Sequence, residues 1–209
     1  MSLLWTSRSP ALQLACALLS FLATAPLKAA VIDFESLSDL DSVTNQFPGL
    51  TFTNTTVLTA GVSVNELELP PHSGIHEVFD DGGPISIAFS GPVLSFGAYF
   101  TYLEPLTLTA FDAASNPVSS AASAYSTNDA LFGDLGSSPN EFLQVSLAGG
   151  ISSVVIAGDP LGTSFTMDDV TYTAASTPVP EPTSFVLFLT AAAGMVAARK
   201  RRPSSSVQR

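Results

Sequence analysis

The sequence predicts an all-β protein: a single antiparallel β-sandwich of jelly-roll type, flanked by an N-terminal signal-peptide helix and a C-terminal transmembrane helix. Two observations carry this prediction. Apolar and polar residues alternate with a period of two over several short segments, and Gly, Pro, Asn and Asp interrupt these segments at short intervals. Between the two chain ends, no segment has the 3.6-residue period of an amphipathic helix.

The clearest strand pattern lies between Val93 and Tyr102, where Phe96, Ala98 and Phe100 alternate with smaller or polar neighbours. About eight segments have a strand pattern, and we predict strands at 31–35, 50–53, 85–89, 93–102, 105–112, 143–147, 151–157 and 165–173. Short strands separated by regular turn signals are typical of a β-sandwich.

The first 30 residues are typical of a secretory signal peptide. Arg8 gives the basic start, residues 11–25 are apolar, and small residues lead to a cleavage site expected after Ala29 or Ala30. Cleavage removes Cys16, the only cysteine in the chain. The mature protein therefore has no disulfide, no thiol nucleophile and no cysteine-based metal site.

The C-terminal region has an uncharged apolar run from Thr183 to Ala198, preceded by Pro180 and Pro182. As a helix this run is roughly 24 Å long, slightly short of the ~20 residues that usually span a bilayer. A buried core helix is the alternative, but such a helix is normally amphipathic and this run is apolar on all sides. Four cations follow the run and place its end on the cytoplasmic side: Arg199, Lys200, Arg201 and Arg202.

The order of Pro180, Glu181 and Pro182, an apolar span and a basic cluster resembles the PEP-CTERM sorting signal of Gram-negative bacteria. The resemblance implies recognition and cleavage by a membrane exosortase after export. It also implies an inner-membrane precursor with only a transient anchor, a final place at the cell surface or outside the cell, and a setting in which extracellular polysaccharide is made. The predicted divisions are a signal peptide (1–30), a β-sandwich (31–174), a linker with the Pro-Glu-Pro motif (175–182), a transmembrane segment with its basic cluster (183–202) and a cytoplasmic tail (203–209).

Charge is distributed unevenly along the chain. All 18 acidic residues lie between Asp33 and Glu181, and all seven Lys and Arg residues lie outside that stretch. Without Lys or Arg, the domain cannot contact nucleic-acid phosphates in the usual way, so we exclude nucleic acid as a partner. The acids either keep a secreted protein soluble or are bridged by cations, for which calcium is the natural choice outside the cytoplasm.

Three acids are candidate calcium ligands: Glu35, Asp168 and Asp169. Glu35 follows Phe34 in the first predicted strand, and the two aspartates precede Val170 in the last. This pairing resembles β-sandwich carbohydrate-binding modules and galactose-binding-like folds, in which such acids often meet at a structural calcium. Calcium needs six to eight oxygen ligands, so backbone carbonyls and water would complete the site. The alternative is that these acids face solvent at a strand edge.

Other polar residues give weaker signals. Asp80–Asp81 and Asn128–Asp129 with Asp134 are predicted as solvated turns that could also bind calcium. His72 and His76 have the four-residue spacing of a helical zinc site, but the prolines before them favour loop histidines. Tyr99, on the polar side of its strand, is the best candidate for an exposed ring that stacks on a sugar.

No sequence pattern indicates catalysis. The chain lacks a G-x-S-x-G nucleophile elbow and a glycine-rich phosphate loop, and no carboxylate pair stands out as glycosidase machinery. We therefore expect a non-enzymatic cell-surface or extracellular-matrix protein whose partners are the exosortase and the export machinery. A carbohydrate-binding module that binds extracellular polysaccharide is the alternative, and a secreted glycosidase is the third possibility.

Overall fold

The structure is a computed structural model that describes residues 29–175. These residues belong to one compact unit, Pro26–Ser176. They form nine β-strands and no helix: β1 (Ala29–Ile32), β2 (Leu50–Thr53), β3 (Thr55–Thr59), β4 (His76–Asp80), β5 (Ile85–Tyr102), β6 (Thr107–Phe111), β7 (Pro117–Ala122), β8 (Glu141–Ala157) and β9 (Phe165–Ala174).

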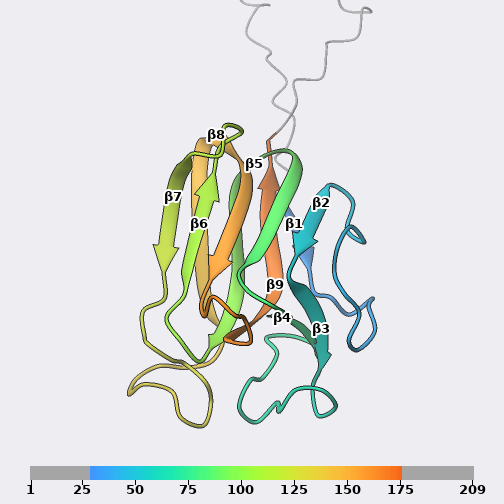
Figure 1. Ribbon diagram of the computed structural model, residues 1–209, viewed down its shortest axis with the longest axis vertical. Helices are drawn as coiled ribbons and strands as arrows, with labels where there is room; N and C mark the ends of the chain where they lie inside the picture. Colours follow the sequence, from blue (N-terminus) through green and yellow to red (C-terminus); the bar gives the residue numbers. More distant parts are fainter. Residues whose placement is uncertain (1–28, 176–209) are drawn as a thin grey trace, which may run out of the picture. The chain divides into compact units, whose positions relative to one another are not determined.

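Two long strands, β5 and β8, connect the two layers of the sandwich (Figure 1). The register between them shifts near Val93, so each strand bends and contributes to both layers. Before the bend β5 pairs with β2, and after it with β9. The full hydrogen-bonded order is β3-β4-β9-β5-β8-β6-β7, with β1 on β9 and β2 on β5, and every pairing is antiparallel. The predicted antiparallel β-sandwich is confirmed.

The core consists of the alternating apolar residues that the sequence pattern selects. Phe96, Ala98, Phe100 and Tyr102 of β5 all have no exposed surface. Each large apolar side chain buried in this way contributes about 1.5–3 kcal/mol to folding. Because the core and its strand pairings lie within residues 29–175, this segment has what it needs to fold by itself.

Strand boundaries differ from the prediction in several places. The predicted strands 85–89 and 93–102 are one bent strand, β5, and 143–147 and 151–157 are one bent strand, β8. Three strands were not predicted, namely β3, β4 and β7, because they carry Thr, Ser and acidic residues in place of a clean alternation. These strands are stabilised by pairing with neighbours that are distant in the sequence.

The first strand is shifted relative to the prediction. It begins at Ala29, where Ala29 and Ala30 pair with Thr173 and Tyr172, and it ends at Ile32. Cleavage after Ala30 would remove the first two of these pairs. The prediction that Glu35 lies within the first strand is therefore wrong. Glu35 lies in the turn after β1.

The two ends of the described segment lie together, since Ala29 pairs with Thr173. At the opposite end of the sandwich lie the β3–β4, β5–β6, β7–β8 and β8–β9 loops (Figure 1). Between residues 29 and 175, no helix has the length and apolar character needed to cross a membrane. The predicted signal peptide, Pro-Glu-Pro motif and transmembrane segment fall outside the described residues.

Candidate functional site

The three predicted calcium ligands converge on one loop. This loop, between β3 and β4, and His76 at the start of β4 place residues 72–76 against all three carboxylates. His76, predicted as a loop histidine, therefore belongs to a strand. Glu35 Oε1 accepts hydrogen bonds from the backbone N–H groups of Ile75 (2.9 Å) and His76 (2.7 Å). Asp168 Oδ2 accepts one from the backbone N–H of Ser73 (2.8 Å). We call Glu35, Asp168, Asp169 and residues 72–76 the acid clasp.

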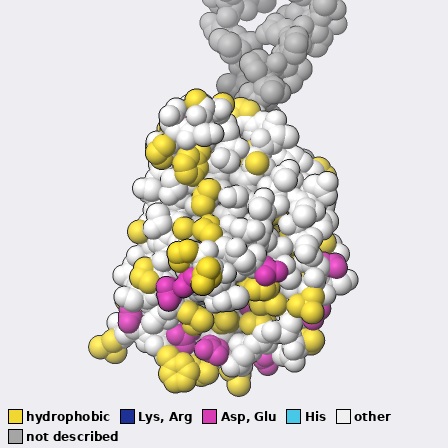
Figure 2. All heavy atoms as spheres, viewed as in Figure 1, with side chains coloured by type: hydrophobic (Ala, Val, Ile, Leu, Met, Phe, Trp, Pro, Cys, Tyr) yellow, Lys and Arg dark blue, Asp and Glu magenta, His cyan; other side chains and the backbone are white. Residues whose placement is uncertain are grey.

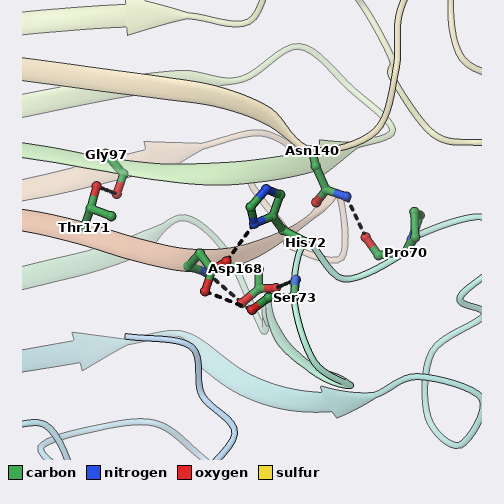
Figure 3. Close-up of polar contacts among 8 residues, drawn as sticks. Pro70, His72, Ser73, Gly97, Asn140, Asp168 and Thr171 are labelled. Atoms are coloured by element: carbon green, nitrogen blue, oxygen red, sulfur yellow. Dashed lines mark hydrogen bonds and ion pairs between the residues drawn. The ribbon is translucent and has the colours of Figure 1, made fainter. Parts of the chain in front are cut away.

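Side chains of the loop complete the clasp. The Ser73 hydroxyl donates to Asp169 Oδ1 at 3.0 Å, and His72 Nδ1 lies 2.6 Å from Asp169 Oδ2 (Figure 3). His76 Nδ1 lies 3.5 Å from Glu35 Oε2. Because residues 29–175 contain no Lys or Arg, the two histidines are the only side chains there that can carry a compensating positive charge.

The backbone is strained on both sides of the clasp. Phe34 and Asp169 have positive φ angles of 59° and 45°, which are unfavourable for residues other than glycine. Gly74 also has a positive φ, and a Cβ atom there would lie only 2.2 Å from Glu35 Oε1. The loop can approach the carboxylate only because position 74 has no side chain. Strain at this level persists only where surrounding contacts hold it in place.

Asp168 of the clasp and its neighbour Glu77 are both buried carboxylates. Asp168 and Glu77 are each 1% exposed, and the pairing of Val78 with Met167 places them side by side on adjacent strands. Burial raises the pKa of Asp168 to about 6. Burial also raises the pKa of Glu77 to about 8, and the negative charge of Asp168 adds to the effect. Glu77 Oε1 has no hydrogen-bond partner among the described residues.

An aromatic row continues across the same face of the sheet. Tyr99 on β5 pairs with Asp168 on β9, and Phe142 on β8 pairs with Tyr99. The His72 ring stacks on Tyr99, with ring centroids 3.4 Å apart and planes 8° apart. Phe142 lies 4.9 Å from Tyr99 and is 42% exposed. Tyr99 is therefore partly covered by His72, and Phe142 is the ring that solvent reaches most easily.

The geometry of the clasp bears on metal binding. Five of the six carboxylate oxygens of Glu35, Asp168 and Asp169 are hydrogen-bonded to groups of the protein. The sixth, Glu35 Oε2, lies 3.5 Å from His76 Nδ1. Within residues 29–175, no group of three or more His, Cys, Asp or Glu side chains is placed to hold a metal ion. A calcium ion would have to replace loop donors as the partner of these oxygens. The two histidines contact different carboxylates and do not converge on one point.

The other predicted acids serve as local hydrogen-bond acceptors. Asp80, which was expected in a loop, is the fully buried last residue of β4, and its carboxylate accepts from the Ser164 and Phe165 backbone N–H groups. Asp129 accepts from the backbone of Leu131 and Phe132, and Asp134 accepts from that of Ser126. These contacts fix turns, but only Asp134 is exposed as predicted: Asn128 and Asp129, which were expected in a solvated turn, are buried.

Sequence reasoning missed Ser73, Glu77 and Phe142. The exposure of Phe142 was predictable from the sequence. Leu143 and Val145 are buried, and alternation along a strand then puts Phe142, the residue before Leu143, on the outer face. Glu77 gave no signal, because β4 itself was not predicted.

Comparison with known proteins separates the sorting tail from the domain. Residues 178–202 match the PEP-CTERM protein-sorting motif, which confirms the predicted sorting signal and marks the chain for export. No curated protein matches the chain.

Among solved structures, the K2 cleaved adhesin domain of Lys-gingipain is 14% identical, with a TM-score of 0.44, over 70% of this chain and 98% of that one. TmCBM61, solved in complex with β-1,4-galactotriose, is 15% identical, with a TM-score of 0.40, over 68% and 94%. The CBM22-1 xylan-binding domain from Paenibacillus barcinonensis Xyn10C is 12% identical, with a TM-score of 0.38, over 74% and 99%.

Proposed function

We propose that this chain is an exported, non-catalytic protein of the cell surface or extracellular matrix, whose working part is the β-sandwich at residues 29–175. The observation that carries the proposal is the arrangement of the chain. The compact unit that holds the β-sandwich ends at Ser176, its described residues 29–175 contain no Lys or Arg, and the sorting motif begins at Pro178.

In this proposal the tail is temporary. An exosortase recognises the Pro180–Pro182 motif and cuts near it, and the apolar span and the Arg199–Arg202 cluster are left behind in the inner membrane. The domain then reaches the surface or the extracellular matrix without its anchor. Its acidic surface suits a protein that must stay soluble outside the cell.

The geometry of the domain supports a non-catalytic role. Each clasp carboxylate accepts a hydrogen bond from the β3–β4 loop, which favours a structural role for these acids. Two surface cavities, of about 370 and 340 Å³, are each lined by a single carboxylate, Asp81 in one and Glu68 in the other. Glycoside hydrolysis usually requires a facing pair.

Carbohydrate binding is the second candidate function, and the aromatic row favours it. Phe142 and the outer side of His72 present ring surface on one face of the sheet, where a sugar ring could stack. Asn140 lies near His72 and offers further hydrogen-bonding groups (Figure 3). Its side-chain amide donates to the Pro70 carbonyl oxygen. Phe142 and His72 are then the residues that contact the glycan.

Calcium binding also remains a proposal. Three carboxylates within reach of one loop provide hard oxygen ligands, and calcium would compensate charge where Lys and Arg are absent. Glu35, Asp168 and Asp169 would hold the ion, which would stabilise the fold without taking part in chemistry.

One experiment tests the proposed function and its alternative together. The purified unit 26–176 is incubated with xylan, β-1,4-galactan and cellulose, with and without calcium, and both bound protein and new reducing ends are measured. We expect no new reducing ends on any polysaccharide. Release of reducing ends by this unit would contradict the non-catalytic assignment. Retention on a polysaccharide that is lost in Phe142→Ala, but not in a Phe132→Ala control, would establish the carbohydrate-binding alternative.

A further inference from the structure

The loop end of the sandwich, formed by the β3–β4, β5–β6, β7–β8 and β8–β9 loops, exposes apolar side chains on every one of its loops. Phe132 is 77% exposed and Leu161 is 84% exposed, whereas the apolar residues of the core are buried. The exposed apolar residues of the loop end include Leu67, Leu103, Leu131, Phe132, Leu135 and Leu161. Figure 2 shows hydrophobic and acidic side chains gathered over this end, without Lys or Arg among them. Several large apolar side chains exposed at one end of a domain favour an interaction site there.

A cavity of about 340 Å³ opens within the loop end. Its walls include the apolar side chains of Leu58, Phe79 and Leu103, and Glu68 is its single carboxylate. Thr166 also lines it and is 2% exposed. A long basic side chain matches these properties, because its methylene stem packs on apolar walls while its charged head reaches a carboxylate.

The loops that carry these residues are held to one another. The backbone N–H of Ala130 donates to the Glu68 carbonyl oxygen at 2.9 Å, which joins the β7–β8 and β3–β4 loops. The backbone N–H of Leu103 donates to the Ser164 carbonyl oxygen at 2.8 Å, which joins the β5–β6 and β8–β9 loops. A surface fixed in this way loses little conformational entropy on binding.

Charge decides which occupant fits. Exposed or half-buried acids lie beside the apolar residues on the same loops, at Glu66, Glu68, Glu104 and Asp134. A second copy of the domain would bring like charge to this surface, and so would an anionic membrane. We propose that the loop end is a docking surface for a segment of a partner protein that combines basic and apolar side chains, with one Lys or Arg inserted into the cavity beside Glu68.

Titration with defined peptides tests this inference. The ¹⁵N-labelled unit 26–176 is titrated with a dodecapeptide of alternating Leu and Lys, and amide shifts are followed by NMR. Matched peptides of alternating Leu and Glu, and of alternating Ser and Lys, separate the apolar and basic requirements. We expect the Leu–Lys peptide to shift amides of the four loops, the Leu–Glu peptide to shift none, and the Ser–Lys peptide to bind at least about tenfold more weakly, the effect of about 1.4 kcal/mol of lost apolar contact.

Two variants of the loop end and one control complete the design. Glu68→Gln combined with Leu103→Ser should weaken the Leu–Lys peptide at least about tenfold. Phe132→Ser, at an exposed position that cannot disturb the core, should also weaken it. The control combines Val31→Ser with Asp112→Asn, one exposed apolar and one half-buried acidic residue outside the four loops, and should bind as the unmodified protein does.

Several outcomes would overturn the inference. Equal binding of the Ser–Lys and Leu–Lys peptides would show simple attraction of opposite charges. Shifts confined to other parts of the domain, or unchanged binding in both loop-end variants, would place the site elsewhere. Peptide-free dimerisation through the same amides would identify a second copy as the occupant, and shifts there with xylohexaose but not with the Leu–Lys peptide would identify a glycan.

Discussion

Gly162, in the β8–β9 loop, occupies a position that no side chain can share. Its φ angle is +87°, and a Cβ atom there would lie 2.4 Å from the Asp80 carbonyl oxygen and 2.6 Å from the Gly83 nitrogen. The neighbouring Thr163 N–H donates to the same Asp80 oxygen at 2.7 Å. This glycine lets the loop close over the buried end of β4.

We therefore predict that Gly162→Ala destabilises the domain by about 2–4 kcal/mol, because alanine is strained at this positive φ and its Cβ would clash with the end of β4 and the turn after it. Chemical denaturation of the unit 26–176 measures the loss. Gly91→Ala is the matched control, since a Cβ atom at that position meets no other atom within 4 Å. Equal stability of the two variants would show that the β8–β9 loop does not need this close approach.

Glu77 makes the stability of the domain depend on pH. Its pKa is raised from 4.5 to about 8 in the folded state, mainly by burial. Between these two pH values the folded protein binds more protons than the unfolded protein, so the free energy of unfolding falls as the pH rises. Asp168, with its pKa raised from 3.8 to about 6, acts in the same direction between those values.

We predict that Glu77→Gln stabilises the domain at pH 8 by about 1–3 kcal/mol, because it removes a buried charge that no cation compensates. The dependence of the melting temperature on pH between 5 and 8 should become flatter. Melting curves recorded with a chelator measure this, and Glu104→Gln, at an exposed position, is the control. A Glu77→Gln variant that keeps the full pH dependence would mean that Glu77 is ionised in the folded protein throughout this range.

At the scale of elements, the β3–β4 loop is the part of the fold that makes a site. It brings His72 and Ser73 to Asp169, and it brings the backbone of residues 75 and 76 to Glu35. The sequence indicated that Glu35, Asp168 and Asp169 belong together. It did not indicate that a loop would supply their donors, because the contacts join residues about 40 and 95 positions apart.

Strands with clean alternation, such as the two halves of β5, were predictable, because one buried face leaves a period of two in the sequence. Strands β3, β4 and β7 were not. In β4, Glu77 and Asp80 are buried on opposite faces of the strand. The strand is therefore buried but shows no alternation of apolar and polar residues in the sequence. The bends that join predicted pairs of strands into β5 and β8 arise from register shifts between distant segments, which no local pattern records.

The calcium proposal belongs to this scale, because the ion would tie the turn after β1 to β9. If calcium binds, a concentration 100 times its Kd should stabilise the unit by about 2.7 kcal/mol, or about 5–10 °C in Tm. Asp168→Asn should abolish the gain, whereas Asp112→Asn should keep it. Equal melting temperatures with calcium and with chelator would contradict the proposal and leave the loop donors as the sole partners of the acids.

At the scale of the whole molecule, the acidic residues and the basic residues lie in different parts of the chain. The domain between the two sorting segments holds no Lys or Arg, and the cations are at the ends that would be removed. The sorting motif at residues 178–202, which contains four of these cations, marks the chain for export. This division was readable from the sequence, since it rests on composition and order along the chain and not on contacts in space.

The most direct test of the account is the intact mass of the protein as the native cell exports it. We predict a single species that begins at Ala30 or Val31 and ends near Pro180–Pro182, without the apolar span and the Arg199–Arg202 cluster. A variant with Ala at positions 180, 181 and 182 should instead keep the tail and remain in the membrane fraction. An exported wild-type protein whose mass includes Arg199–Arg202 would contradict the proposal that the domain works free of its sorting tail.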